Sequence, residues 1–258
     1  MRTVVCYKAV FNNEQISINP DKSISTAGAS LEIGQYDLNA VEAGARLLSE
    51  GKTDSVIALS AVCGAADDSK MRKSVLSRGV NELVLVKDDA MGDADTYMTA
   101  CALSAAVKSL GDVELVIFGE GSGDLYSQQT GAMTGAVLGW PTVNAVSSVG
   151  KDDQGRLIVT RQLETCTEEL EVELPAVICV TSDINTPRIP SLKEIMAAGK
   201  KPVKAVDFAE LGLAPQCRSV AVDSVEAPEQ HSRRREVYDA DNAEAIEELC
   251  RALSRAAM

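Results

Sequence analysis

A strand, a glycine-rich loop and a helix follow one another over residues 115–146, and this unit constrains the fold more than any other stretch of the chain. The apolar run LVIF is short and contains β-branched residues, as expected of a strand buried in a parallel sheet. The loop GEGSGD follows, and Asp124 is in a position to cap a helix ending near Leu138, before Gly139 and Pro141. A strand that passes through a tight loop into a helix is the basic unit of an α/β fold.

This unit favours the binding of an anion. Glycines let the backbone approach a ligand, and the N–H groups and dipole at a helix start favour phosphate. Inside the helix, Gly131 and Gly135 keep one face small, at a cost of roughly 1 kcal/mol each relative to alanine. Two explanations stay open, because either the sheet or a ligand can require this close approach. The loop matches neither GxGxxG nor GxxxxGK[ST], and its two acids argue against a triphosphate site.

Similar units recur over the first 120 residues of the chain. We expect strands at residues 3–7, 55–60, 83–86 and 113–118, and helices at 38–48, 67–77 and from Asp93 or Asp95 to 110. Asp37 is the expected cap of the first helix and Gly51 its end. This alternation predicts an α/β fold with a doubly wound, mostly parallel sheet of the Rossmann-like, adenine-nucleotide-binding kind. Ligands bind at the carboxyl ends of such strands, so the loops after Tyr7, Ser60 and Phe118 should converge.

The pattern changes after residue 146. Residues 156–163 and 167–174 alternate apolar and polar side chains, which predicts an antiparallel hairpin, and 176–181 reads as another buried strand. Ser191 can cap a short helix, whose C-terminus Lys200 and Lys201 would stabilise. Polar residues 12–29 are expected to form a loop or a short hairpin.

Beyond residue 206 the chain becomes polar and contains Pro215 and Pro228. It ends in a predicted helix at 241–257, in which Ile246, Leu249 and Leu253 form one stripe. We therefore expect an α/β domain at residues 1–205 and an extended C-terminal arm at 206–258. The stripe would either return to the core of the chain or dock on a partner.

Charge and cysteine usage exclude several classes of function. The net charge of −13 disfavours nucleic acids and anionic membranes as partners. The seven cysteines are an odd number without a CxxC pair, which favours reduced thiols in the cytoplasm over disulfides or a metal centre. No secretory signal opens the chain, and no apolar run approaches the roughly 20 residues of a membrane helix. The single histidine, His231, lies beside Arg233–Arg235 in a polar tail, so histidine catalysis is not expected.

Six motifs, in this order, make the chain resemble the small (β) subunit of electron-transfer flavoproteins. They are VVCYK at 4–8, QYDLNAVEAGARL at 35–47, ALSAVCG at 58–64, RKSVLSRG at 72–79, DLYSQQTGAMTGAVLGWP at 124–141 and LPAVICVTSDINTPRIPSLKEIMAAGKKP at 174–202. The resemblance covers about residues 1–205. GEGSGDLYSQQTG and TSDIN resemble the Fix-type branch, which is associated with nitrogen fixation and with anaerobic carnitine or acyl-CoA metabolism.

The resemblance implies a heterodimer with a larger α subunit, which carries most contacts to a shared, redox-active FAD. The β subunit adds an adenine-nucleotide site that holds AMP or, in electron-bifurcating members, a second FAD. The family's nucleotide contacts correspond here to Cys6, Gly34, Gln35, Tyr36, Asp37, Ala61, Asp124, Leu125, Tyr126, Ser127, Gln128, Gln129, Thr130, Gly131, Ala132, Met133, Thr134 and Gly135. The family's usual Asn-Pro-Phe is replaced here by Gly34-Gln35-Tyr36, and its acid-rich loop by GDLYSQ, so AMP and FAD both remain open.

The family's partner-recognition segment corresponds to Ser191, Leu192, Lys193, Glu194, Ile195 and Met196. An exposed leucine in a loop framed by prolines is a suitable docking residue. The alternative is that Leu192 and Ile195 simply cover the edge of the sheet.

The resemblance implies a subunit that passes electrons between dehydrogenases and an acceptor, which would be a quinone oxidoreductase, a ferredoxin or an acyl-CoA pathway. The flavin then performs the redox chemistry, since the sequence offers no set of catalytic side chains. A bifurcating form would accept hydride from NADH at the second FAD. The competing hypotheses are a stand-alone nucleotide-binding protein or hydrolase and an NAD-dependent dehydrogenase. The hydrolase lacks its Ser/Gly-rich loop after the first strand, and the dehydrogenase lacks its glycine fingerprint.

Overall fold

The computed structural model describes residues 1–64, 67–214, 219–220, 222–229 and 235–256. The chain divides into a main unit, Met1–Ser17 with Ser25–Ser224, and a smaller second unit, Ile18–Ile24 with Val225–Met258. His231, Arg233, Arg234, Pro215 and Cys217 lie outside the described residues. None of the described helices combines the length and the apolar character that crossing a membrane requires.

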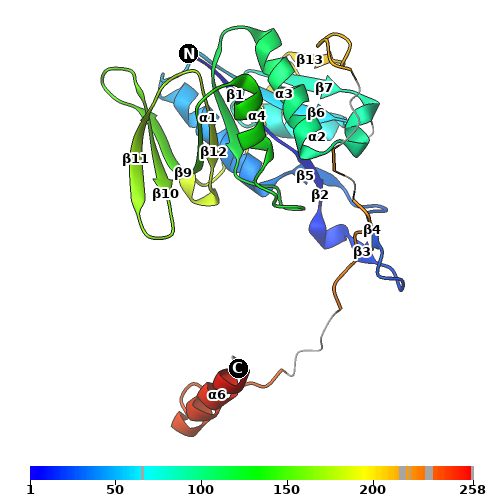
Figure 1. The fold of residues 1–258 in the computed structure, drawn as a ribbon, viewed down its shortest axis with the longest axis vertical. Coiled ribbons are helices and arrows are strands. Elements are labelled where there is room, and N and C mark those ends of the chain that lie inside the picture. Colours follow the sequence, from blue (N-terminus) through cyan, green and yellow to red (C-terminus); the bar gives the residue numbers. More distant parts are fainter. Residues whose placement is uncertain (65–66, 215–218, 221, 230–234, 257–258) are drawn as a thin grey trace. The chain divides into compact units, whose positions relative to one another are not determined.

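Within the described residues, one nine-stranded sheet organises the main unit, in the order β11-β10-β9-β12-β8-β1-β6-β7-β13 (Figure 1). The parallel part consists of β1 (Arg2–Cys6), β6 (Ser55–Val62), β7 (Glu82–Lys87), β8 (Val113–Gly119), β12 (Ala176–Val180) and β13 (Val203–Val206). On the far side, β9 (Thr142–Lys151) runs parallel to β12 and antiparallel to β10 (Leu157–Gln162), which pairs with β11 (Thr167–Val172). The predicted α/β fold with a mostly parallel sheet and an antiparallel hairpin is confirmed.

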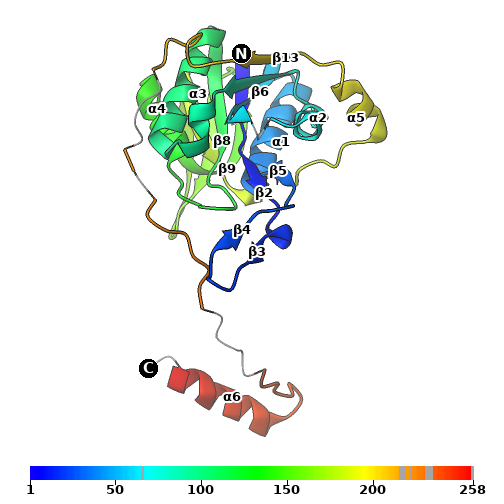
Figure 2. The ribbon, with the colours of Figure 1, turned by 90° about the vertical axis from the view of Figure 1, so that its right-hand side faces the viewer.

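Helices cover both faces of this sheet (Figure 2). The helices are α1 (Gln35–Ser49), α2 (Ser69–Leu76), α3 (Thr96–Leu110), α4 (Thr130–Leu138), α5 (Leu192–Ala198) and, in the second unit, α6 (Ala243–Ala256). One hydrophobic cluster joins α1 and α2 to the sheet, and another joins α3 to the opposite face. This explains why β1 reads as a continuous apolar run, since Val4 and Val5 are both fully buried but belong to different clusters.

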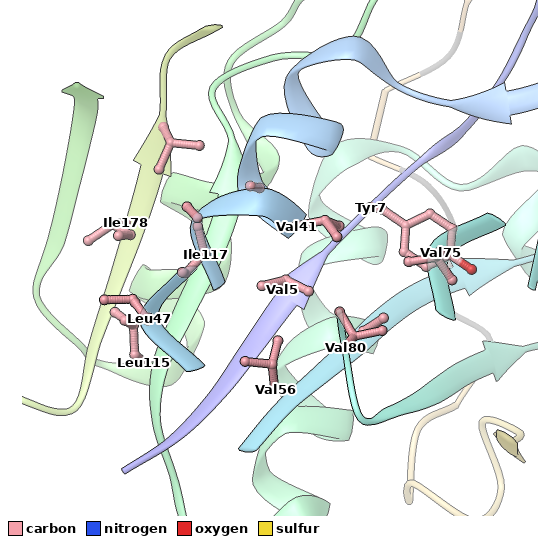
Figure 3. Packing of buried hydrophobic residues seen from close by; sticks show 14 of the residues in the cluster. Val5, Tyr7, Val41, Leu47, Val56, Val75, Val80, Leu115, Ile117 and Ile178 are labelled. Atoms are coloured by element: carbon pink, nitrogen blue, oxygen red, sulfur yellow. The ribbon is translucent and has the colours of Figure 1, made fainter. Parts of the chain in front are cut away.

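The first cluster shows how closely α1 approaches the sheet. Figure 3 shows strand residues Val5, Val56, Leu115, Ile117 and Ile178 beside Val41 and Leu47 of α1. A side chain at Gly44 of α1 would place its Cβ 2.5 Å from the Cγ1 of Val5. The glycine lets α1 pack directly on β1, which brings the start of α1 close to the end of that strand.

Most predicted element ends are confirmed, but two helices begin elsewhere. Asp95 caps α3, and Gly51, Gly111 and Gly139 adopt positive φ just after their helices. In contrast, Gly34 is the N-cap of α1, so Asp37 lies in its first turn instead of capping it. The prediction that Asp124 caps a helix is wrong, because α4 begins only at Thr130.

Two small sheets form within residues 9–33, where we expected a loop or short hairpin at 12–29. The short strand β2 (Ala9–Phe11) pairs with β5 (Leu31–Ile33) in one small sheet. Between them, β3 (Ser17–Ile18) and β4 (Ile24–Ser25) form another two-stranded sheet. The predicted short hairpin is therefore present within this segment.

The main unit continues beyond residue 206, where we expected the arm to begin. Strand β13 pairs with β7, and Phe208 is 3% exposed within the second hydrophobic cluster. Near the unit's end, the backbone N–H groups of Ser219 and Val220 donate to the Asp95 carboxylate at 2.6 and 3.2 Å. In the second unit, the predicted C-terminal helix is present as α6, with Ile246 and Leu253 exposed.

Candidate functional site

The strand order creates a switch point at the carboxyl ends of β1 and β8, and we call this edge of the sheet the crevice. Strand β1 lies between β6 and β8, so the chain leaves β1 toward one side and later returns to its other side. Such a switch point is where doubly wound sheets bind ligands. The predicted convergence of the loops after Tyr7, Ser60 and Phe118 is confirmed, because these loops follow three neighbouring strands.

A buried carboxylate joins the two sides of this crevice. The Oδ2 atom of Asp37, a residue that is 6% exposed, accepts the backbone N–H of Lys8 at 2.7 Å. Burial raises the pKa of Asp37 to about 7, although hydrogen bonds from the N–H groups of Lys8 and Gly119 lower it. A Cβ at Gly119 would lie 2.6 Å from the carbonyl carbon of Tyr36 and 2.7 Å from Asp37 Oδ1. Only a glycine at position 119 therefore lets the end of β8 approach the start of α1 this closely.

An ion pair crosses the mouth of the crevice above Asp37. The Lys8 ammonium contacts Asp124 Oδ2 at 2.6 Å, and both side chains are a little under half exposed. Partial burial raises the pKa of Asp124, but hydrogen bonds from Lys8 and Ser122 outweigh it and leave the pKa below its ordinary value. Asp124 also accepts the N–H of Leu125 at 2.8 Å. The carboxylate predicted to cap a helix thus connects the β8 loop to the end of β1.

Two tyrosines from different elements lie side by side at this site. The rings of Tyr36 and Tyr126 have centroids 5.3 Å apart and are tilted by 43°. The Tyr126 ring leaves no room for a side chain at Gly121, and its hydroxyl donates to Glu120 at 3.1 Å. Tyr126 and Gln128 adopt φ values of +46° and +54°, in the left-handed region that side chains disfavour. The loop is held in a strained conformation of the kind that collects at functional sites.

The first turn of α4 has no side-chain cap. Its N-cap residue, Gln129, makes no capping hydrogen bond, and its amide oxygen instead accepts from the Thr96 hydroxyl at 3.0 Å. The two glycines of α4 are required by close packing of the helix on the sheet. A Cβ at Gly131 would collide with Cys179 Sγ, and one at Gly135 with the Thr142 hydroxyl. A helix start without a side-chain cap leaves backbone N–H groups that can donate hydrogen bonds to an anion.

The other predicted nucleotide contacts are divided between the crevice and the core. Leu125, Ser127 and Gln128 are exposed in the loop, and Gln35 is exposed at the start of α1. Cys6 is 3% exposed in the second hydrophobic cluster, where burial raises the pKa of its thiol. Ala61, Ala132 and Met133 are half-buried, and Thr134 is fully buried with its hydroxyl donating to the Thr130 carbonyl at 2.7 Å. The structure therefore brings together residues 34–37 and 124–130 but turns the side chain of Cys6 away.

The predicted recognition segment forms an exposed apolar surface around α5. Ser191 caps this helix in a capping box with Glu194, as the sequence predicted for the serine. The apolar side chains of this surface are Ile189, Leu192, Ile195 and Met196, which are 93%, 74%, 43% and 71% exposed. The alternative that Leu192 and Ile195 cover the sheet edge is wrong for the chain as folded here. We call these four residues the α5 surface.

Charged and amide side chains hold the chain on both sides of the α5 surface. The Glu42 carboxylate of α1 accepts from Arg188 Nε at 2.7 Å and from Arg188 Nη2 at 3.2 Å. Asn39, one turn earlier in α1, donates to the carbonyl of Asn185 at 2.8 Å. Arg78 donates to the Arg188 carbonyl at 2.6 Å. These contacts position the segment that enters α5.

The far end of the segment is held by Lys201. Its ammonium donates to the carbonyls of Leu76 and Val80 at 2.8 and 2.6 Å, at the end of α2. The expectation that Lys201 stabilises the C-terminus of its own helix is therefore wrong. Sequence reasoning missed Glu42 and Arg188 as a pair, because they are 146 positions apart and carry no local signal.

Comparison with protein families gives one finding that covers most of the chain. A family model described as the electron transfer flavoprotein domain matches residues 22–211 of the 258 residues. The matched span contains α1, the loop after β8, α4 and the α5 surface.

Proposed function

The chain belongs to the electron transfer flavoprotein family, and we propose that it is the small (β) subunit of a heterodimer in the Fix-type branch. In this role it passes electrons between a dehydrogenase and an acceptor, together with a larger α subunit. The single observation that carries the proposal is that the chain combines a switch point at the edge of its sheet with the exposed α5 surface. One feature suits a nucleotide and the other suits a protein partner.

The crevice fits an adenine nucleotide. The uncapped first turn of α4 offers N–H donors to a phosphate, and the tyrosine pair offers aromatic surface to a flat ring. We propose that the nucleotide site comprises residues 34–37, 124–135 and the backbone at Cys6 and Ala61. The buried residues Gly131, Thr134 and Gly135 would position the first turn of α4 within this site. A flavin shared with the α subunit would supply the redox chemistry, while this chain binds and orients it.

Two nucleotides remain candidates for the crevice. AMP would have a structural role, as in a simple electron carrier. A second FAD would make the protein electron-bifurcating, with hydride accepted from NADH. The paired rings of Tyr36 and Tyr126 favour a planar ligand but do not choose between adenine and isoalloxazine.

Two surfaces are proposed to bind protein partners. The α5 surface, with the rest of residues 191–196, would contact the dehydrogenase or the quinone-oxidoreductase-type acceptor, with Leu192 as its anchor. We expected the arm at residues 206–258; because the main unit extends to Ser224, we propose that the part from Val225 onward docks on the α subunit, through the stripe of α6. The described cysteines are all free thiols, which supports the proposed cytoplasmic location.

The test is the nucleotide content of the protein purified together with its α subunit. Nucleotides released by heat would be identified by mass spectrometry. One FAD and one AMP per heterodimer is the result expected of a simple carrier, and two FADs is the result expected of a bifurcating one. Recovery of the chain without an α subunit and without nucleotide would refute the proposed function.

A further inference from the structure

The ion pair of Lys8 and Asp124 lies where a phosphate group would enter the crevice. Lys8 directly follows Tyr7 at the end of β1, and Asp124 belongs to the loop after β8, so the 2.6 Å contact links the two sides of the switch point. Lys8 is also bound through its backbone N–H to Asp37, at the bottom of the same crevice. The pair is a little under half exposed, so a solute can reach it.

The charged groups around Lys8 determine whether an anionic solute is attracted or repelled. Of the described groups, Lys8 is the cation whose charge acts on both Asp37 and Asp124. A nucleotide phosphate entering here faces the Asp124 carboxylate, the partly ionised Asp37 and one ammonium already neutralised by Asp124. Like charges at close range are strongly unfavourable, so the phosphate can stay only if Lys8 becomes available to it.

The loop that carries Asp124 combines a glycine with strained backbone positions. Gly123 lies directly before Asp124, and a side chain there would meet no atom within 4 Å. Beyond Asp124, Tyr126 and Gln128 hold left-handed φ values. Breaking the ion pair therefore frees the Asp124 carboxylate next to a glycine, while the contact of Tyr126 with Tyr36 still holds the loop beyond it.

We propose that Lys8 is the phosphate-binding side chain of this crevice and that Asp124 occupies its ammonium until a nucleotide enters. The phosphate then takes the place of the Asp124 carboxylate, and the backbone around Gly123 shifts. The inference rests on the proposed function, and it assigns opposite roles to two neighbouring residues. Lys8 binds the ligand, whereas Asp124 competes with it.

The experiment measures how tightly the full chain binds AMP, FAD and adenosine by calorimetry, for the natural protein and for Lys8→Gln and Asp124→Asn. Lys8→Gln should weaken AMP and FAD about tenfold, which is typical of a partly exposed charge-assisted contact. Asp124→Asn should tighten both ligands several-fold, because the competing carboxylate is gone. Adenosine, which carries no phosphate, should bind all three proteins equally.

Lys87→Gln is the matched control. Lys87 lies at the end of β7, much as Lys8 follows the end of β1. It is 43% exposed and forms an ion pair with Asp67 at 3.0 Å, but it is not one of the crevice residues. It should bind every ligand like the natural protein. The inference would be overturned, and the proposed function would stand, if Lys8→Gln bound AMP and FAD as tightly as the natural protein does. The same holds if Asp124→Asn bound them more weakly than the natural protein does. If the natural chain bound none of the three ligands, the proposed function would fail together with it.

Discussion

Asp37 shows how one residue can connect two parts of a site that are far apart in sequence. Its carboxylate lies in the first turn of α1 and accepts N–H groups from Lys8, after β1, and from Gly119, at the end of β8. A buried carboxylate is costly when ionised, even with two such donors. Protonation of Asp37 should therefore change the hydrogen bonds that hold the end of β1 and the end of β8 together.

The pH dependence of stability should reveal this cost. The pKa of Asp37 rises from 3.8 to about 7 on folding, so between these values the folded chain holds a proton that the unfolded chain has released. Its contribution to the free energy of unfolding is thus present below pH 4 and is lost as the pH rises to 7, by on the order of 4 kcal/mol. Lys8, Asp124 and the Cys6 thiol are the titratable groups that face it.

Urea unfolding of the natural chain and of Asp37→Asn at pH 5 and at pH 8 measures this effect. The natural chain should lose more stability between the two pH values than the variant does. Asp112→Asn is the control, because Arg2 holds the pKa of that exposed carboxyl below its ordinary value, so its contribution to stability does not change between pH 5 and pH 8. Parallel pH curves for the natural chain and Asp37→Asn would show that Asp37 does not titrate in this range.

At the scale of elements, the segment around α5 is held at its ends and free in its middle. Residues 182–188 are bound to α1 by Asn39 and Glu42, and Lys201 is bound to the end of α2. Between these points the α5 surface is exposed. Such an arrangement lowers the entropy lost on docking, because the surface is already ordered before a partner arrives.

Removing the charge of Glu42 should loosen this segment. Glu42→Gln keeps the shape of the side chain but leaves the Arg188 guanidinium without its carboxylate, which we expect to cost about 1–3 kcal/mol. In hydrogen exchange, the amides of residues 189–199 should exchange faster, while those of α3 should not change. Arg46→Gln is the control, because Arg46 is the half-exposed i,i+4 partner of the same carboxylate, worth about 0.5 kcal/mol or less. Unchanged exchange at residues 189–199 in Glu42→Gln would rule out this anchoring role.

At the scale of the whole molecule, the two units differ in how they are stabilised. The main unit has a hydrophobic cluster on each face of its sheet. The second unit relies on contacts such as the Lys22–Glu229 ion pair at 2.8 Å, and α6 leaves Ile246 and Leu253 exposed. An amphipathic helix with an uncovered apolar stripe is suited to bind a groove on another protein.

Charging that stripe should weaken the heterodimer without unfolding the main unit. Ile246→Asp with Leu253→Asp should reduce co-purification of the α subunit at least tenfold, since each apolar contact is worth about 1.5–3 kcal/mol when buried. The melting temperature of the main unit should stay the same. Arg251→Gln, on the opposite face of α6, serves as the control and should retain the α subunit. Full retention of the α subunit by the double variant would exclude α6 as the docking element.

Local patterns in the sequence were sufficient for most of the elements and for the family. Apolar runs marked the parallel strands, glycines at residues 51, 111 and 139 marked helix ends, and Ser191 marked the start of α5. These signals depend on neighbouring residues, because hydrogen-bonding period and capping act within one or two turns. The motif at 124–141 pointed to the family but misplaced the start of α4.

The tertiary structure alone decided which side chains meet. Lys8 and Asp124 are 116 positions apart, and Glu42 and Arg188 are 146 apart; each pair depends on the order in which the strands join the sheet. Before the late start of α4, Tyr126 and Gln128 adopt left-handed φ values, which a helix does not allow, and Tyr126 packs on Tyr36 of α1. Strand order and loop contacts arise from packing between distant segments. No periodicity or local motif in the sequence encodes them, and the site is built from them.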